Sequence, residues 1–254
     1  MPFILLERVL HALALTSDSV PLDDPAPSSA AHVLVRVWLP DRPGALGLVA
    51  SRIGAVRGDI VGVDVLERGT DVAVDEFAVD LPDVDLVPTL VREVEEVDGV
   101  SVEEVRVVSH FPDARLDALE SAAALCAATT VEELHTVLVS QTRREFLADW
   151  AALVNGSRVM ARAGDNAPSG EVLEALVTGT SASTLVSDGV TGPDDLAVAS
   201  FAGHDVALLL GRAGHPLRRR ERAQLLALVG IADRAWELLG DYNVPREHDR
   251  HASA

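Results

Sequence analysis

The stretch LPDRPGALG, residues 39–47, holds the best candidates for binding chemistry in this chain. Pro43 suits the first turn of a helix, where its missing N–H costs nothing, and Gly44 lets the backbone approach a partner closely. The amides of Gly44, Ala45 and Leu46 would then lie at a helix N-terminus, which favours an anion such as an α-carboxylate. The sequence therefore predicts a carboxylate-binding turn.

Binding a whole amino acid also requires an acceptor for its ammonium group. Asp41 lies in the same loop, and Asp59 with Ile60 opens the next expected strand, which this topology can bring near the loop. The alternative is that both aspartates serve only as caps and solubilising charges around a tight turn that binds nothing. The expected binding residues are Asp41, Arg42, Pro43, Gly44, Ala45, Leu46, Asp59 and Ile60.

The rest of the chain shows no complete catalytic motif. The stretch GTSAS at 179–183 lacks the closing glycine of a nucleophile elbow. All 21 basic residues are Arg, so no lysine can form a Schiff base or bind the phosphates of a nucleoside triphosphate. His248, Asp249 and His251 carry metal-binding groups, but they follow a proline in a polar tail, so we expect no metal site. We expect neither an enzyme nor a cofactor.

Composition limits the partners of the protein. The net charge is −19 and both halves are acidic, so we expect no binding to nucleic acid. The one dense basic cluster, LRRRER at 217–222, should form solvated first turns of a helix, with a salt bridge to Glu221 or to a partner as a further possibility. The N-terminus lacks the positive region of a signal peptide, so we expect none. The sequence contains no uninterrupted apolar run of about 18 residues, so we also expect no membrane span. The single cysteine cannot form a disulfide within the chain. Without a disulfide framework, we expect the protein to be cytoplasmic.

Two composition breaks divide the chain. Residues 17–31 are rich in Pro, Ser and Asp without periodicity, as in a linker, and a second break falls at SHFPDARLD, residues 109–117. The expected organisation is an N-terminal extension and linker at 1–31, a first domain at 32–110, a second domain at 113–240 and a disordered tail at 241–254.

The first domain opens with an expected strand, helix and two further strands. Residues 33–39 alternate with the period of a strand, and residues 46–56 place apolar side chains three and four positions apart, as on one helix face. Residues 59–82 predict two strands joined at 68–70, with a bulge where the alternation slips at Asp75-Glu76.

A second helix and a fourth strand complete this domain. Val87, Leu90, Val94 and Val97 form one helix face, with Asp85 as the expected N-cap and a glycine two residues after Val97 as its end. The run VSVEEVRVV, from residue 100, predicts the last strand, so the element order is β-α-β-β-α-β.

That order, together with the DRPG loop after the first strand, resembles the ACT domain, a small ligand-binding module often attached to enzymes of amino-acid metabolism. The resemblance covers about residues 32–110 and rests on Asp41-Arg42-Pro43-Gly44, the following Ala45-Leu46, and Gly58-Asp59-Ile60. It implies a ferredoxin-like βαββαβ fold and an effector site lined by this loop and the start of the second strand, often at a dimer interface. Many members have Asn where Asp59 stands, which keeps an acceptor and removes a donor.

The second domain is expected to place helices around an antiparallel sheet. Two helices should meet near Thr129-Thr130, and hairpins should turn at Asn155-Gly156 and at Ala202-Gly203. A helix at SGEVLEALVTG should lie between the two hairpins in the sequence. A last helix should bury one face, made of Leu225, Val229, Ala232, Trp236 and Leu239.

This order resembles a GAF domain, a family of small-molecule and signalling sensor modules, in its topology and in the final stretch ALLLGRAGHPLRRRERAQLLALVGIAD. The resemblance implies an α/β domain with a central antiparallel sheet flanked by helices. Some GAF modules anchor a tetrapyrrole through a cysteine, but Cys126 lies in SAAALCAAT, which predicts a small core residue on a buried helix.

The expected function is therefore non-enzymatic regulation. The first domain would bind an amino-acid effector or a related small carboxylate, the second would sense or transmit, and a homodimer would form through the first domain. The main alternative is a dimerising scaffold without a small-molecule ligand. A third alternative, an enzyme of unknown type, rests only on the cavity-prone architecture of the GAF-like domain.

Overall fold

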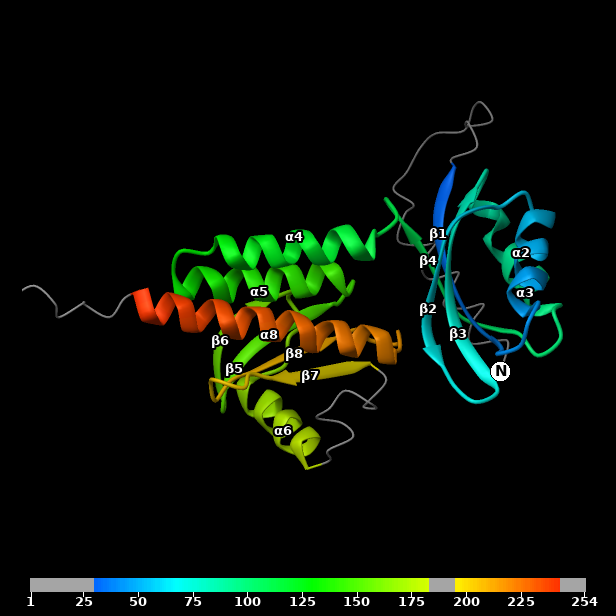
Figure 1. The fold of residues 1–254 in the computed structure, drawn as a ribbon. Helices are drawn as coiled ribbons and strands as arrows, with labels where there is room; N and C mark the ends of the chain where they lie inside the picture. Colours follow the sequence, from blue (N-terminus) through cyan, green and yellow to red (C-terminus); the bar gives the residue numbers. More distant parts are fainter. Residues whose placement is uncertain (1–29, 183–194, 243–254) are drawn as a thin grey trace, which may run out of the picture. The chain divides into compact units, whose positions relative to one another are not determined.

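The computed structural model describes residues 30–182 and 195–242 (Figure 1). The chain divides into two compact units, Met1–Phe111 and Pro112–Ala254. The described residues form two antiparallel four-stranded sheets and six α-helices, which confirms the expected α+β class. Most of the expected N-terminal extension and tail, including His248, Asp249 and His251, lies outside the described residues. None of the described helices is both long and apolar enough to cross a membrane.

The first unit has the expected order of strands and helices. Its sheet runs β2-β3-β1-β4, with every neighbouring pair antiparallel. Helices α2 and α3 cover one face of this sheet (Figure 1). The elements are β1 Ala31–Pro40, α2 Ala45–Ala55, β2 Asp59–Arg68, β3 Val72–Leu81, the short 3₁₀ turn η1 Val84–Leu86, α3 Val87–Glu95 and β4 Ser101–Val108.

The core of the first unit lies between the sheet and these two helices. Val35 on β1 pairs with Phe77 on β3, and both side chains are fully buried. Ile53 of α2 and Leu90 of α3 pack into the same cluster, as the spacing of apolar residues in each helix requires. This packing fixes α2, and therefore the loop before it, at the end of β1.

Two local expectations in the first unit are wrong. The pairing of β1 with β3 continues without interruption past Asp75, and the irregularities fall instead on the β2 side, between Val65 and Glu67 and near Ile60. The alternation of apolar and polar residues is interrupted here because Val74, on the opposite face of β3, is also buried. Asp85, the expected N-cap, is also not the capping residue. The side chain of Asp83 accepts a hydrogen bond from the amide of Asp85 and so caps η1, which leads into α3.

The second unit encloses its sheet between helices. The strand order is β6-β5-β8-β7, and all pairs are antiparallel. Helices α4, α5 and α8 lie on one face and α6 on the other (Figure 1). The elements are α4 Ala114–Ala127, α5 Val131–Glu145, β5 Trp150–Asn155, β6 Arg158–Ala163, α6 Gly170–Ser181, β7 Leu196–Ser200, β8 Ala207–Gly211 and α8 Arg219–Tyr242.

Both faces of the second sheet are buried, so the unit has two cores. On β5, Leu153 packs toward the three-helix side while its neighbour Val154 packs toward α6, as the two-residue period of a strand requires. The expected helix face of α8 is present, with Leu225, Val229 and Ala232 buried. Both expected hairpins are also present, at the ends of β5 and β7.

Two side-chain expectations in the second unit need correction. Cys126 is exposed on α4 and is not a core residue, because Leu125, next to it, takes the inward position on the helix. The basic cluster at 217–222 is only partly solvated. Arg222 is 7% exposed, since its guanidinium donates a 2.8 Å hydrogen bond to the carbonyl of Leu196 and so fastens α8 to the start of β7.

Candidate functional site

The loop that joins β1 to α2 is held in place by backbone hydrogen bonds. The amide of Asp41 donates to the carbonyl of Asp71 at 2.9 Å, and the amide of Arg42 donates to the carbonyl of Pro40 at 2.8 Å. Gly44 is the N-cap of α2 and has φ of 88°, a left-handed conformation that favours glycine. The loop therefore reverses the chain sharply and delivers it into the helix.

The N-terminus of α2 has no side-chain cap. The first amides of an α-helix lack acceptors within the helix, and together they favour negative charge. The amide of Ala45 donates to the carbonyl of Arg42 at a long 3.3 Å, and regular helical bonding begins when Leu48 donates to the carbonyl of Gly44. Of the three amides expected to be free, those of Gly44, Ala45 and Leu46, the amide of Ala45 is therefore already engaged within the loop.

A cavity of about 440 Å³ opens at this N-terminus. Its walls include six of the eight residues expected from the sequence, Asp41 to Leu46, so the structure brings the whole DRPG loop to one site. The remaining walls come from the sheet, where Leu39, Val65 and Ala73 supply apolar surface, and Arg68 and Asp75 supply charge.

Asp59 and Ile60 do not reach this cavity. Strands β1 and β2 are both antiparallel to β3, so they run in the same direction. Asp59 is in register with Asp80, which pairs with His32 at the start of β1, whereas the loop follows Pro40 at its end. At about 3.3 Å per residue, the two places are roughly 25 Å apart within one copy. The expected proximity of Asp59 to the loop is wrong because strand direction decides it.

A second carboxylate, that of Asp75, lines the cavity together with that of Asp41. Asp75 is 2% exposed, and its Oδ1 atom has no hydrogen-bond partner. It lies in register with Val37 on β1 and with Val65 on β2, so its strand neighbours are apolar. Burial raises the pKa of Asp75, and the negative charge of Asp41 adds to this, while the guanidinium of Arg68 opposes it.

Arg68 and Asp41 form an ion pair at the rim of the cavity. The guanidinium donates to Oδ1 of Asp41 at 2.9 Å, with the Arg68 side chain 70% exposed. Exposed pairs of this kind contribute little to stability. The pair does, however, occupy Arg68 with Asp41, so Asp75 is left as the buried charge of the site.

Sequence reasoning missed Asp75, although a signal was present. Asp75 interrupts the apolar run VAVDEFAV, where a carboxylate on a buried strand face is unusual. An interrupted alternation is compatible with a bulge or with a buried functional group, and here it marks the buried group.

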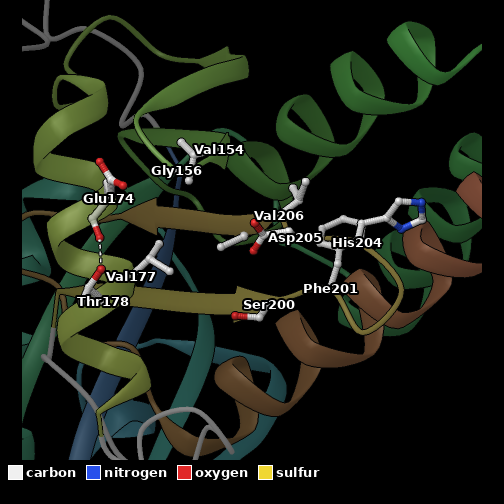
Figure 2. Close-up of a pocket in the computed structure, with 11 residues that line it drawn as sticks. Val154, Gly156, Glu174, Val177, Thr178, Ser200, Phe201, His204, Asp205 and Val206 are labelled. Atoms are coloured by element: carbon white, nitrogen blue, oxygen red, sulfur yellow. Dashed lines mark hydrogen bonds between the residues drawn. The ribbon is translucent and has the colours of Figure 1, made fainter.

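A second cavity, of about 310 Å³, lies in the second unit between α6 and the ends of the strands (Figure 2). Glu174, Val177 and Thr178 line it from α6, and the loop between β7 and β8 closes the opposite side with Phe201 and Asp205. The hydroxyl of Thr178 donates to the backbone carbonyl of Glu174 at 2.9 Å, so it is already engaged within the helix.

His204 belongs to the same loop, but its ring lies elsewhere. Figure 2 shows the imidazole pointing away from the cavity and from Ser200. Its Nδ1 lies 2.8 Å from Oδ1 of Asp233, and Oδ2 of Asp233 accepts the amides of Ala202 and Gly203. The histidine and aspartate therefore hold the loop against α8, and Ser200 does not complete a catalytic triad with them.

Within residues 30–182 and 195–242, no three His, Cys, Asp or Glu side chains gather in a way that could hold a metal ion.

Comparison with known proteins gives no family for this chain. No family model and no curated protein matches it. One similar solved structure is the ACT domain of the GTP pyrophosphokinase of Chlorobium tepidum, at 17% identity, with a TM-score of 0.25, covering 33% of this chain and 89% of the other. Another is an unknown protein of Galdieria sulphuraria, at 14% identity, with a TM-score of 0.30, covering 84% of this chain and 95% of the other.

Proposed function

We propose that this protein is a non-enzymatic regulator whose first unit binds an amino acid or a related small carboxylate. The observation that carries the proposal is the cavity of about 440 Å³ at the uncapped N-terminus of α2. A carboxylate bound there would accept hydrogen bonds from backbone amides of the first helical turn, and it would lie at the positive end of the helix dipole. The first unit would then act as an ACT-like domain.

The second unit would transmit the binding event. Its sheet between helices, with a cavity on the α6 side, supports a sensing or coupling role of the kind expected of a GAF-like domain. Coupling requires the ligand to bind one arrangement of the protein more tightly than another.

A thermal-shift screen of the full chain tests the proposal. The twenty amino acids and a set of simple carboxylates are the probes, each at a large excess. A ligand at a hundredfold excess over its dissociation constant stabilises the folded state by about 2.7 kcal/mol, which is a shift of a few degrees. Gly44→Val should remove the shift, because a β-branched residue does not adopt the φ of 88° at the N-cap. If no amino acid or carboxylate stabilises the wild-type protein, the proposal fails.

A dimerising scaffold is the second candidate, and exposed apolar side chains favour it. On edge strand β2, Val61, Val63 and Val65 are 39–50% exposed on a strand whose outer edge is unpaired in this sheet. On α4, Leu119 is 70% exposed and Leu116 is 52% exposed, one helical turn apart. Each is an apolar surface of the kind that a second copy could cover.

Sedimentation of the full chain distinguishes these surfaces. Val63→Glu would break a dimer formed through the first unit, and Leu119→Glu would break one formed through the second. Both residues are exposed, so neither change should unfold its unit. A wild-type protein that sediments as a monomer at all concentrations would remove the scaffold proposal.

A further inference from the structure

We propose that Asp75 accepts the ammonium group of the ligand, so that the cavity at the start of α2 selects zwitterionic amino acids over simple carboxylates. This inference rests on the proposed function and adds the residue that determines specificity, in the role that the sequence analysis gave to Asp41 and Asp59.

Asp75 is a buried carboxylate with one unsatisfied oxygen atom. A buried carboxylate is costly unless it is paired and hydrogen-bonded. Asp75 is 2% exposed, its Oδ1 has no hydrogen-bond partner, and its cross-strand neighbours are Val37 and Val65. An oxygen of this kind can accept a hydrogen bond from a donor that comes from outside the chain.

The nearby arginine does not supply that donor. Arg68 directs its guanidinium to Asp41 at 2.9 Å and is mostly exposed at the rim. It acts on Asp75 only through space, by lowering the pKa that burial raises. A cationic ligand group inside the cavity would do what Arg68 does not, by donating hydrogen bonds to the Asp75 carboxylate.

The position of Asp75 matches the second half of an amino acid. Asp75 lies on the helix-facing side of β3, in the same strand phase as Ala73 and Phe77. It lines the same cavity as Gly44, Ala45 and Leu46 at the N-terminus of α2. One cavity therefore offers backbone donors for a carboxylate and a carboxylate for an ammonium group. A ligand with only a carboxylate would leave Asp75 without a partner, and such a ligand would therefore bind the protein more weakly than an amino acid.

The test compares amino acids with analogues that lack only the amine. Isothermal titration at pH 7.5 measures L-leucine against 4-methylpentanoate, L-phenylalanine against 3-phenylpropanoate, and L-serine against 3-hydroxypropanoate. For at least one pair, the wild-type chain should bind the amino acid at least about thirtyfold more tightly, as expected when a buried charge loses its partner. Asp75→Asn should reduce that preference to within about threefold.

The control variant is Asp98→Asn, which removes the same charge from an exposed position of the first unit. It should keep the preference of the wild type. Circular dichroism confirms that both variants are folded, and the preference ratio separates a role in recognition from a general loss of structure, which would weaken both members of a pair.

Each outcome decides a different proposal. Equal affinity for both members of every pair in the wild type, or an undiminished preference in Asp75→Asn, would overturn the role of Asp75 and leave carboxylate binding intact. If none of the six compounds binds the wild type, the assignment of Asp75 falls, and if the wider amino-acid and carboxylate screen is also negative, the proposed function falls with it.

Discussion

The imidazole of His204 lies flat against the indole of Trp236, with ring centroids 4.0 Å apart and planes 16° from parallel. The rings of His135 and Trp236 meet edge-to-face, with centroids 4.3 Å apart and planes at 66°. Trp236 on α8 is thus in contact with a histidine from the β7–β8 loop and a histidine from α5. This cluster joins three segments of the second unit.

Asp233→Ala should destabilise the second unit by about 2–4 kcal/mol. The substitution removes the acceptor of the Ala202 and Gly203 amides and of the His204 ring, and it leaves partly buried donors without partners. Urea unfolding followed by tryptophan fluorescence measures the effect. Glu237→Ala, at an exposed position one turn along α8, is the control and should change stability by less than about 1 kcal/mol. Equal effects of the two substitutions would contradict the role of Asp233.

The second unit should lose stability as the pH falls below about 6.5, the ordinary pKa of histidine. Burial lowers the pKa of His135 in the folded state, and the charge of His204 adds to this while that of Glu132 opposes it. The unfolded chain therefore takes up a proton at a higher pH than the folded chain, and acid favours unfolding. His135→Phe should flatten the dependence of the unfolding midpoint on pH between 7 and 5.

Asp233 acts in a separate, more acidic range. Burial alone would raise the pKa of Asp233, but the hydrogen bonds from His204, Gly203 and Ala202 together hold it below its ordinary value of 3.8. Its stabilising contribution is thus present above pH 4 and lost only below it.

The His135 prediction would be contradicted by a His135→Phe variant that keeps the full wild-type loss of stability between pH 7 and pH 5, because another group would then be responsible for that loss.

Asp75→Asn should stabilise the ligand-free protein at neutral pH by about 1–2 kcal/mol, because it removes a buried charge that lacks a partner. Burial raises the pKa of Asp75, so the folded wild type holds its proton to a higher pH than the unfolded chain does. The wild type consequently gains stability as the pH falls through that raised pKa, and the advantage of the variant shrinks.

Thermal unfolding at pH 8 and pH 5 measures both parts of this prediction, with Asp98→Asn as the charge-matched control. A wild type that is more stable than Asp75→Asn at pH 8 would mean that the carboxylate has a favourable interaction in the ligand-free protein.

Gly44→Ala should cost about 1–2 kcal/mol through backbone strain alone. Gly44 has φ of 88°, yet a Cβ atom at this position would meet no other atom within 4 Å. Gly44→Asn should cost less, since asparagine tolerates the left-handed region better. Chemical denaturation of the two variants gives the comparison, and an equal loss in both would point to a steric cause instead.

The elements of both units could be predicted from local patterns. The alternation of residues 33–39, the helix face built around Ile53 and the Asn155-Gly156 turn are properties of neighbouring residues, and each occurs where the sequence placed it. Periodicity indicates which side chains are buried because a helix or strand has a fixed repeat.

The site was predictable only in part. The loop from Asp41 to Leu46 carries its own geometry in Pro43 and Gly44, so its place at the helix N-terminus follows from the sequence. The position of Asp59 depends on the direction of two strands that are not hydrogen-bonded to each other, which no local pattern contains. Asp75 required knowledge of which strand faces are buried, and this is a property of the assembled sheet.

The exposure of Cys126 on α4 offers a spectroscopic handle that requires no mutation. It is the only thiol of the chain, so a dye or spin label attached there reports from one defined place in the second unit. The proposed effector enters the first unit, far along the sequence from the label. A change in the label's rotational mobility when an amino acid is added would therefore reveal communication between the two units directly.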